Sequence, residues 1–235
     1  MPSVDRKWMP LALIAAAALA SVFTYGKLPA MVELRLEGML PVEPSEPTDL
    51  VPRWLALSGI PVLALAIWAA FRAAPTAAGQ RVGRLFVRGA PDAVTSPEQF
   101  ARFEKTYDAI VLAVVALVLG VHAAIIAGAL GYAGAAARIV PGVLGGCMIL
   151  MGNVMPRLRP NWVAGVRTKR TLGDPQLWRS THRVLGAAFV VSGVLTMVVA
   201  FMAPRYGLVT GLAALTLSLI VGMVASSRTR PVVTL

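Results

Sequence analysis

Residues 107–130 read YDAIVLAVVALVLGVHAAIIAGAL, an apolar run with one charged residue, Asp108, at its start. About 20 apolar residues are needed for a helix that crosses a hydrocarbon core of about 30 Å. An unpaired backbone amide is costly in lipid, so a run of this kind forms a helix or a strand of a closed barrel. The run is continuous and rich in Ala, Leu and Gly, whereas barrel strands alternate polar and apolar residues. It therefore predicts a transmembrane helix.

Five further segments have the same character, and the whole chain agrees with them. Of its 235 residues 57% are hydrophobic and 14% are charged, against about 25% charged in a soluble domain. The sequence thus predicts an all-α integral membrane protein, a bundle of about six transmembrane helices. The predicted spans are residues 9–25, 54–71, 107–130, 139–154, 184–203 and 206–225.

The first apolar segment has two interpretations. Arg6-Lys7, the apolar run and the small residues Ala18-Leu19-Ala20 resemble a signal peptide with its cleavage site. The apolar run continues through Val22 and Phe23, which favours an uncleaved membrane anchor. Both interpretations place the following loop outside the cell.

The distribution of basic residues predicts the orientation. The two ends of the chain and the second and fourth loops hold 17 Lys and Arg, and the other loops hold five. The positive-inside bias therefore places both termini in the cytoplasm. The net charge of +11 falls entirely on that side. Juxtamembrane Lys and Arg beside anionic inner-leaflet lipids need no other partner, so we expect the lipid bilayer, and no direct nucleic acid, as the partner of this charge.

The spans divide into two predicted modules. Residues 1–106 form an N-terminal two-span module with an external Pro/Glu-rich loop and a cytosolic basic loop, and residues 107–235 form a four-span module. Arg81, Arg84 and Arg88 recur at helical spacing, which is typical of an amphipathic helix at the inner surface or of a charged lead-out of the second span. Pro97 is predicted to start a helix that leads into the third span. Short connections predict tight hairpins between spans three and four and between spans five and six. The glycine-rich 142–146 stretch predicts close helix packing.

Few residues inside the predicted spans suggest chemistry. Buried ionisable groups in a membrane are candidates for function by default. For His122 we expect a neutral imidazole hydrogen-bonded to a helix neighbour, with a proton-linked site as the alternative, and for Asp108 we expect water nearby. The one cysteine, Cys147, is expected to be a small apolar residue in a helix. The sequence shows no catalytic or metal-binding motif, so we expect a protein that is not an enzyme and has no cofactor.

The cytosolic loop between spans four and five, residues 156–183, has specific turn signals. Pro156 ends the preceding helix, Pro160 precedes a second turn, and Gly165 permits a backbone conformation that other residues avoid. Asp174-Pro175 is typical of an N-cap followed by proline in the first helical turn. That helix is predicted to start before the bilayer and to continue into span five, with Trp178, His182 and Leu185 on one face and Arg179 with Arg183 on another. A loop of this length with a fixed shape is usually functional, although a solvated basic loop is the alternative.

At these residues the chain resembles the SdpI family of bacterial membrane proteins, which are immunity and signal transduction proteins for a secreted toxin. The family pattern combines an Asn, Pro and Gly turn segment with an Arg-Thr run and a Trp-x-x-Thr-His-Arg motif. The matching residues are Asn153, Pro156, Pro160, Asn161, Gly165, Arg167, Thr168, Thr171, Leu172, Trp178, Thr181, His182, Arg183 and Gly186. In the front half Leu28-Pro29 also fits, whereas Glu33 and Arg35 stand where the family has Pro and His.

The resemblance implies a multi-pass protein of the bacterial plasma (inner) membrane that confers toxin resistance and sequesters a cytosolic transcriptional repressor at the membrane. An extracellular toxin and a cytosolic repressor protein are the implied partners. We interpret the loop as a rigid docking surface in which Arg167, Thr168, His182 and Arg183 make the polar contacts. Asn153, Pro156, Pro160 and Gly165 then set its shape. Two alternatives remain, namely a small multi-span exporter or permease and a lipid-binding membrane protein without catalytic activity.

Overall fold

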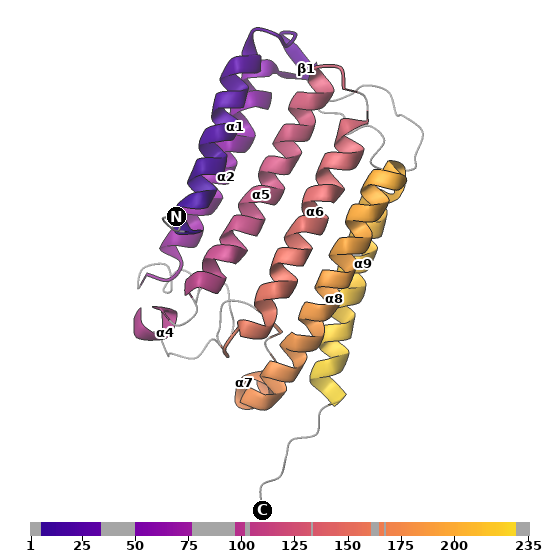
Figure 1. Cartoon of the computed structure of the whole chain (residues 1–235). Helices are drawn as coiled ribbons and strands as arrows, with labels where there is room; N and C mark the ends of the chain where they lie inside the picture. Colours follow the sequence, from indigo (N-terminus) through magenta and orange to yellow (C-terminus); the bar gives the residue numbers. More distant parts are fainter. Residues whose placement is uncertain are drawn as a thin grey trace, which may run out of the picture.

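The computed structural model describes residues 6–33, 50–76, 97–101, 104–132, 134–160, 165–166 and 168–228. Within these residues the chain is an all-α bundle whose long helices run alternately up and down (Figure 1). The long helices are α1 (Met9–Tyr25), α2 (Arg53–Ala73), α5 (Glu104–Ala129), α6 (Ala135–Val154), α8 (Pro175–Met202) and α9 (Pro204–Arg228). The short elements are η1 (Arg6–Trp8), β1 (Met31–Glu33), β2 (Leu50–Pro52), α4 (Pro97–Ala101), η2 (Met155–Arg157) and α7 (Lys169–Gly173).

The helices agree with the predicted spans. Helices α2, α5, α6, α8 and α9 are long and apolar enough to cross a membrane, and α1 is a shorter apolar helix of 17 residues. The predicted all-α membrane bundle is therefore confirmed. The hairpin between α8 and α9 is as tight as predicted, because α9 begins two residues after α8 ends. Helix α4 begins at Pro97, as predicted.

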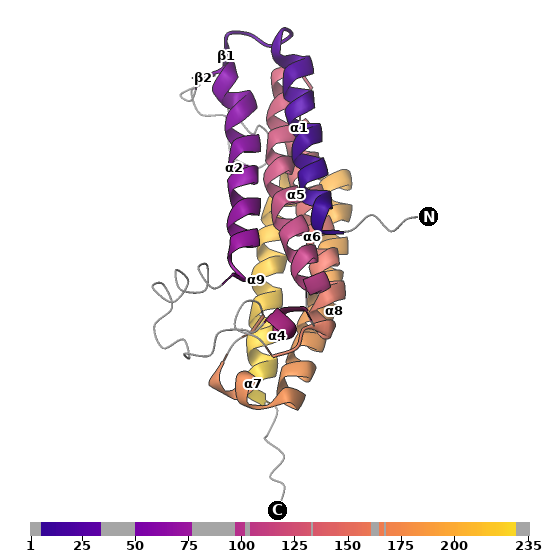
Figure 2. The ribbon, with the colours of Figure 1, turned by 90° about the vertical axis from the view of Figure 1, so that its left-hand side faces the viewer.

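Helix α5 lies at the centre of the bundle and is the most buried span. Helices α1 and α2 pack on one side of it and α6 on the other, and α8 and α9 follow beyond α6 (Figures 1 and 2). Val111 and Val115 of α5 belong to an apolar cluster with residues of α1 and α2. A second cluster is built around Met148 of α6 and Leu185 of α8. The protein thus has an apolar core on each side of the α5–α6 pair.

A short antiparallel ladder closes one end of the bundle. Strand β1 pairs with β2 and places Val32 opposite Val51. Val32 is buried against α2 and α5 together with Leu28. The sequence predicted only a Pro/Glu-rich loop between the first two spans and not this pairing, because three-residue strands carry too little alternation to be recognised.

The other end of α5 carries a buried ion pair. Asp108 is 7% exposed, and its Oδ1 accepts a hydrogen bond from Arg72 Nη1 of α2 at 2.8 Å. The neighbouring Tyr107 donates its hydroxyl to the carbonyl oxygen of Phe71 at 2.6 Å. The sequence did not predict this pairing with Arg72, whose side chain is 31% exposed. These two contacts fix the end of α2 against the start of α5.

Glycines bring α6 and α8 into close contact. A Cβ atom at Gly152 would lie 2.6 Å from the carbonyl oxygen of Gly186, and the reverse distance is the same. Gly145 and Gly193 form a second such pair one heptad away, at 2.7 and 2.6 Å. Small residues at an interface let helix backbones approach in lipid. The predicted close packing at 142–146 therefore comes from Gly145, whereas Gly146 faces open space.

Candidate functional site

The loop between α6 and α8 is attached to the first turns of α8, where the N-cap prediction for Asp174 is confirmed. Asp174 Oδ1 accepts hydrogen bonds from the backbone N–H groups of Gln176 at 2.8 Å and Leu177 at 3.1 Å. Pro175 follows as the first helical residue. Helix α8 then runs without interruption to Met202, so the prediction that the helix capped by Asp174 continues into span five is confirmed.

Trp178 and His182 stack on each other inside the bundle. Their ring centroids are 4.1 Å apart with an interplanar angle of 23°, and both side chains are 0% exposed. The Nδ1 atom of His182 lies 2.8 Å from the carbonyl oxygen of Trp178, and its Nε2 lies 3.1 Å from the backbone nitrogen of Val166. Because Val166 N–H must donate, Nε2 accepts and Nδ1 carries the proton. This neutral tautomer satisfies both ring nitrogens.

Gly165 is fitted against this histidine. Its φ angle is +107°, in the region that only glycine adopts readily. A Cβ atom at this position would overlap His182 Nε2. The prediction that Gly165 adopts a special backbone conformation is therefore confirmed, and the structure adds a second reason for a glycine.

The next part of the loop is held by two threonines. Thr168 is the N-cap of α7, and its hydroxyl accepts the N–H of Thr171 at 3.1 Å. Thr171 Oγ1 accepts the Thr168 N–H at 2.9 Å, which completes a reciprocal capping box. The same Thr171 hydroxyl donates to the carbonyl oxygen of Val166 at 2.7 Å. Val166 is thus held at its N–H by His182 and at its carbonyl by Thr171.

A second contact ties the start of the loop to α8. Trp178 Nε1 donates to the carbonyl oxygen of Leu158 at 2.8 Å, and Leu158 is 3% exposed. Helix α6 ends at Val154, and Pro156 lies in η2 immediately after it. The chain from Pro156 to Pro160 is therefore held close to the first turns of α8.

This arrangement leaves a cavity of about 450 Å³ at the surface. Three arginines line it, Arg157 and Arg159 from the loop and Arg179 from α8, and its other lining residues are apolar. All three arginines are exposed. Guanidinium groups bind carboxylates and phosphates through two parallel hydrogen bonds. The cavity is therefore chemically suited to an anionic group.

The structure places the predicted site residues in different environments. Asn161 and Arg167, and the predicted amphipathic segment with Arg81, Arg84 and Arg88, lie outside the described residues. Asn153 is exposed and donates to the Ile149 carbonyl oxygen of its own helix at 3.0 Å. Thr181 is 0% exposed, and its hydroxyl has no hydrogen-bond partner among the described residues. Of the residues predicted to make polar contacts, Thr168 and Arg183 are exposed, whereas His182 is enclosed and positions the loop.

Sequence reasoning missed Arg157 and Arg159 as site residues. Both flank the prolines of the turn segment, and their spacing of two residues was the available signal. The bond between Trp178 and Leu158, together with the packing of Met155 and Leu158 in the same cluster, holds this segment beside Arg179. In the described part of the chain no three His, Cys, Asp or Glu side chains gather as metal ligands.

The fold and this site define a multi-span, all-α membrane protein with a structured loop at one end of the bundle. Residues 157–227 match the SdpI/YfhL protein family, which is the family that the motif residues of this segment resemble. The matched segment contains α7, α8 and most of α9, together with the loop residues of the arginine cavity. Comparisons with curated proteins and with solved structures gave no match.

Proposed function

We propose that the chain is a non-enzymatic protein of the bacterial plasma membrane that docks an acidic surface of a cytosolic protein at its arginine cavity. By analogy with the SdpI family, the docked protein is a transcriptional repressor. By the same analogy, the chain also protects its host from a secreted toxin. Docking at the membrane would remove the repressor from its operator. Signalling then depends on binding alone.

The single observation that carries the proposal is the cavity lined by Arg157, Arg159 and Arg179. Its walls are fixed, because Trp178 holds Leu158 and Asp174 caps α8. A cavity with a fixed shape loses little freedom when it binds a partner. Arginine stays protonated in proteins and makes a poor general base, which favours binding over catalysis.

Orientation supports a cytosolic partner. The loops on the cavity side of the bundle belong to the group that holds 17 of the 22 Lys and Arg residues. The end of α9 lies at this same end, and α1 starts on the side away from β1 and β2, about halfway along the bundle (Figure 1). We propose that this end, with both termini, faces the cytoplasm.

The transport alternative has less support. His122 is bonded to Ser21 of α1 inside the bundle, and Asn153 is exposed at the cavity end, where it bonds to its own helix. No described hydrogen bond joins these two polar residues across the bundle. A permease would need a polar path between the two ends.

The test replaces Arg157, Arg159 and Arg179 together with Gln in the full-length protein. The matched control is Arg205→Gln, because Arg205 lies at the start of α9, at the opposite end of the bundle. We expect the triple variant to lose membrane recruitment of a fluorescently tagged repressor from the same bacterium, and to lower survival beside a toxin-producing strain. We expect Arg205→Gln to keep both activities when the two variants are present in the membrane in equal amounts. Unchanged recruitment and survival in the triple variant would contradict the proposal.

A further inference from the structure

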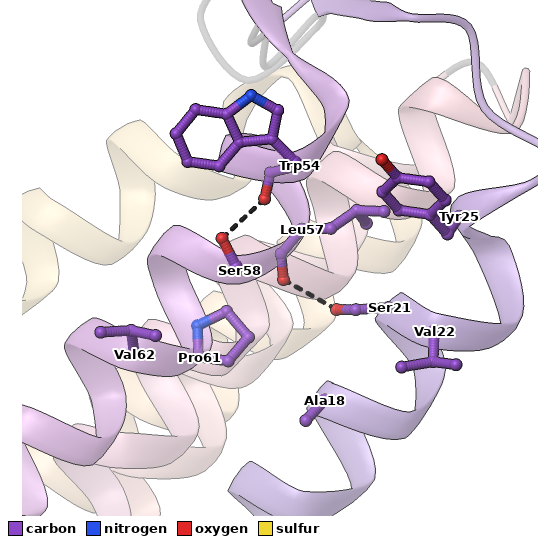
Figure 3. Close-up of a pocket in the computed structure, with 9 residues that line it drawn as sticks. All are labelled: Ala18, Ser21, Val22, Tyr25, Trp54, Leu57, Ser58, Pro61 and Val62. Atoms are coloured by element: carbon purple, nitrogen blue, oxygen red, sulfur yellow. Dashed lines mark hydrogen bonds between the residues drawn. The ribbon is translucent and has the colours of Figure 1, made fainter.

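Helices α1 and α2 leave a groove near the end of the bundle that carries β1 and β2. The cavity has a volume of about 540 Å³, within the range of small-molecule sites. Its floor is formed by the buried residues Ser21, Leu57 and Pro61. Val22 of α1 and Val62 of α2 stand on its two sides and are 72% and 63% exposed (Figure 3). The groove therefore opens toward the surroundings of the bundle, which are lipid for spans of this kind.

The lining of the groove presents hydrocarbon. Its two serines are both engaged, since Ser21 Oγ donates to the carbonyl oxygen of Leu57 at 2.9 Å and Ser58 Oγ donates to that of Trp54 at 2.6 Å (Figure 3). No lining side chain is charged. An occupant in contact with this surface must therefore be apolar along its length, because a polar group would lose its water without gaining a partner.

The upper end of the groove is different. Tyr25 and Trp54 stand on its two sides there (Figure 3), and such aromatic rings are typical of the membrane–water interface. The Arg53 guanidinium lies 4.5 Å from the centre of the Tyr25 ring, and its Nη1 donates to the carbonyl oxygen of Leu28 at 3.1 Å. This leaves a cation fixed at the interfacial end of an apolar groove.

We propose that the groove binds one anionic phospholipid, with an acyl chain along α1 and α2 and the phosphate group at Arg53. Three observations meet in this occupant: an apolar lining, an aromatic pair at interfacial depth and a positioned guanidinium. Arginine has five N–H donors, and only Nη1 is bound to the described residues. The remaining donors suit the oxygens of a phosphate. The site is independent of the cytosolic cavity and does not rest on the proposed function.

The test uses the full-length protein in nanodiscs that contain phosphatidylcholine with a minor fraction of phosphatidylglycerol. After extraction into mild detergent, retained lipid is counted by native mass spectrometry. We expect one phosphatidylglycerol to remain on the native chain. Arg53→Gln is expected to lower its retention about fivefold, the effect of a single interfacial charge. Val62→Trp, which fills the groove, is expected to abolish retention.

Two matched variants make the test specific. Arg205 lies over Tyr206 at 4.6 Å, in almost the same geometry as Arg53 over Tyr25. Tyr25 lines the groove, whereas Tyr206 does not. Val191 of α8 is 69% exposed and lies outside the groove. Arg205→Gln and Val191→Trp should therefore retain lipid as the native chain does. Equal loss in both members of each pair, or no retained lipid on the native chain, would show surrounding membrane lipid only and overturn the proposal. Equal retention of phosphatidylcholine would overturn the role of Arg53.

Discussion

His182 Nε2 occupies the space in which a side chain at Gly165 would begin, and the same nitrogen accepts the N–H of Val166 at 3.1 Å. A glycine in the loop and a histidine 17 residues later thus form a single structural unit. This explains why the turn glycine and the Thr-His-Arg triplet belong to the same motif. The histidine is fully buried and contacts the loop from inside the bundle.

Gly165→Ala is expected to destabilise the loop and with it the first turns of α8. The substitution forces a Cβ atom onto His182 Nε2 and places a non-glycine residue at φ +107°. Strain at such a backbone position costs about 1–3 kcal/mol. The thermal midpoint of the purified protein in detergent should fall. Gly173→Ala is the control, because a Cβ atom at Gly173 meets nothing within 4 Å, and an equal fall in both variants would argue against the His182 contact.

His182→Phe tests the hydrogen bonds apart from the ring packing. Phenylalanine keeps the stacking on Trp178 but has no acceptor for the Val166 N–H. Removal of one partner of a buried hydrogen bond costs about 1–3 kcal/mol. We expect faster amide hydrogen exchange at Val166 and a weaker hold on the loop, with α9 unaffected. The exposed neighbour Arg183 serves as control, and exchange at Val166 that is no faster than in Arg183→Gln would refute the assignment.

Gly152→Ala should loosen the contact between α6 and α8. The added Cβ atom would lie 2.6 Å from the Gly186 carbonyl oxygen, so the backbones must move apart. Gly146→Ala on the same helix meets nothing within 4 Å. That control should be neutral or slightly stabilising, since alanine is preferred to glycine in a helix by about 1 kcal/mol. The free energy of unfolding in sodium dodecyl sulfate is measured for both variants. If the two changes are equal in sign and size, the close contact between Gly152 and Gly186 does not stabilise the protein.

The helices of this protein could be predicted from the sequence because a long, continuous apolar run forms a helix in lipid. The cap at Asp174, the start of α4 at Pro97 and the buried face of Trp178 and His182 also follow from local rules. These features depend on neighbours in the chain. The SdpI-type domain was recognised for the same reason, since its motif residues are close in sequence.

What could not be predicted depends on contacts between distant segments. Asp108 and Arg72 are 36 residues apart in the sequence, and no local sequence pattern predicts that they pair. The arginine cavity requires the bond from Trp178 to Leu158, and the role of His182 as a positioning residue requires Gly165 to lie against it. Charge counting predicted the side of the membrane for these residues and could not predict which of them are enclosed.

Pro61 creates a defect in α2 that α1 repairs. Proline has no N–H, so the carbonyl oxygen of Leu57, four residues earlier, lacks its helical donor. Ser21 Oγ of α1 donates to this oxygen at 2.9 Å, and the same Oγ lies 2.9 Å from His122 Nε2 of α5. Ser21 Oγ also lies 3.0 Å from the carbonyl oxygen of Ala17, and because its one hydrogen serves these two carbonyl oxygens, His122 Nε2 donates to Ser21. The predicted hydrogen bond of His122 thus exists, and it joins three helices.

A double-mutant cycle on Ser21 and Pro61 tests this repair. Ser21→Ala leaves the Leu57 carbonyl and His122 Nε2 without their partner. We expect a loss of about 0.6–1.7 kcal/mol, from the mean to the maximum found for side-chain hydrogen bonds between membrane helices. Pro61→Ala restores a backbone N–H for Leu57, so Ser21→Ala should cost less in that background. The remaining cost is the part that belongs to His122. Free energies of unfolding in mixed micelles for the native chain and the three variants give the coupling, and strictly additive values would show that Ser21 does not serve the Leu57 carbonyl.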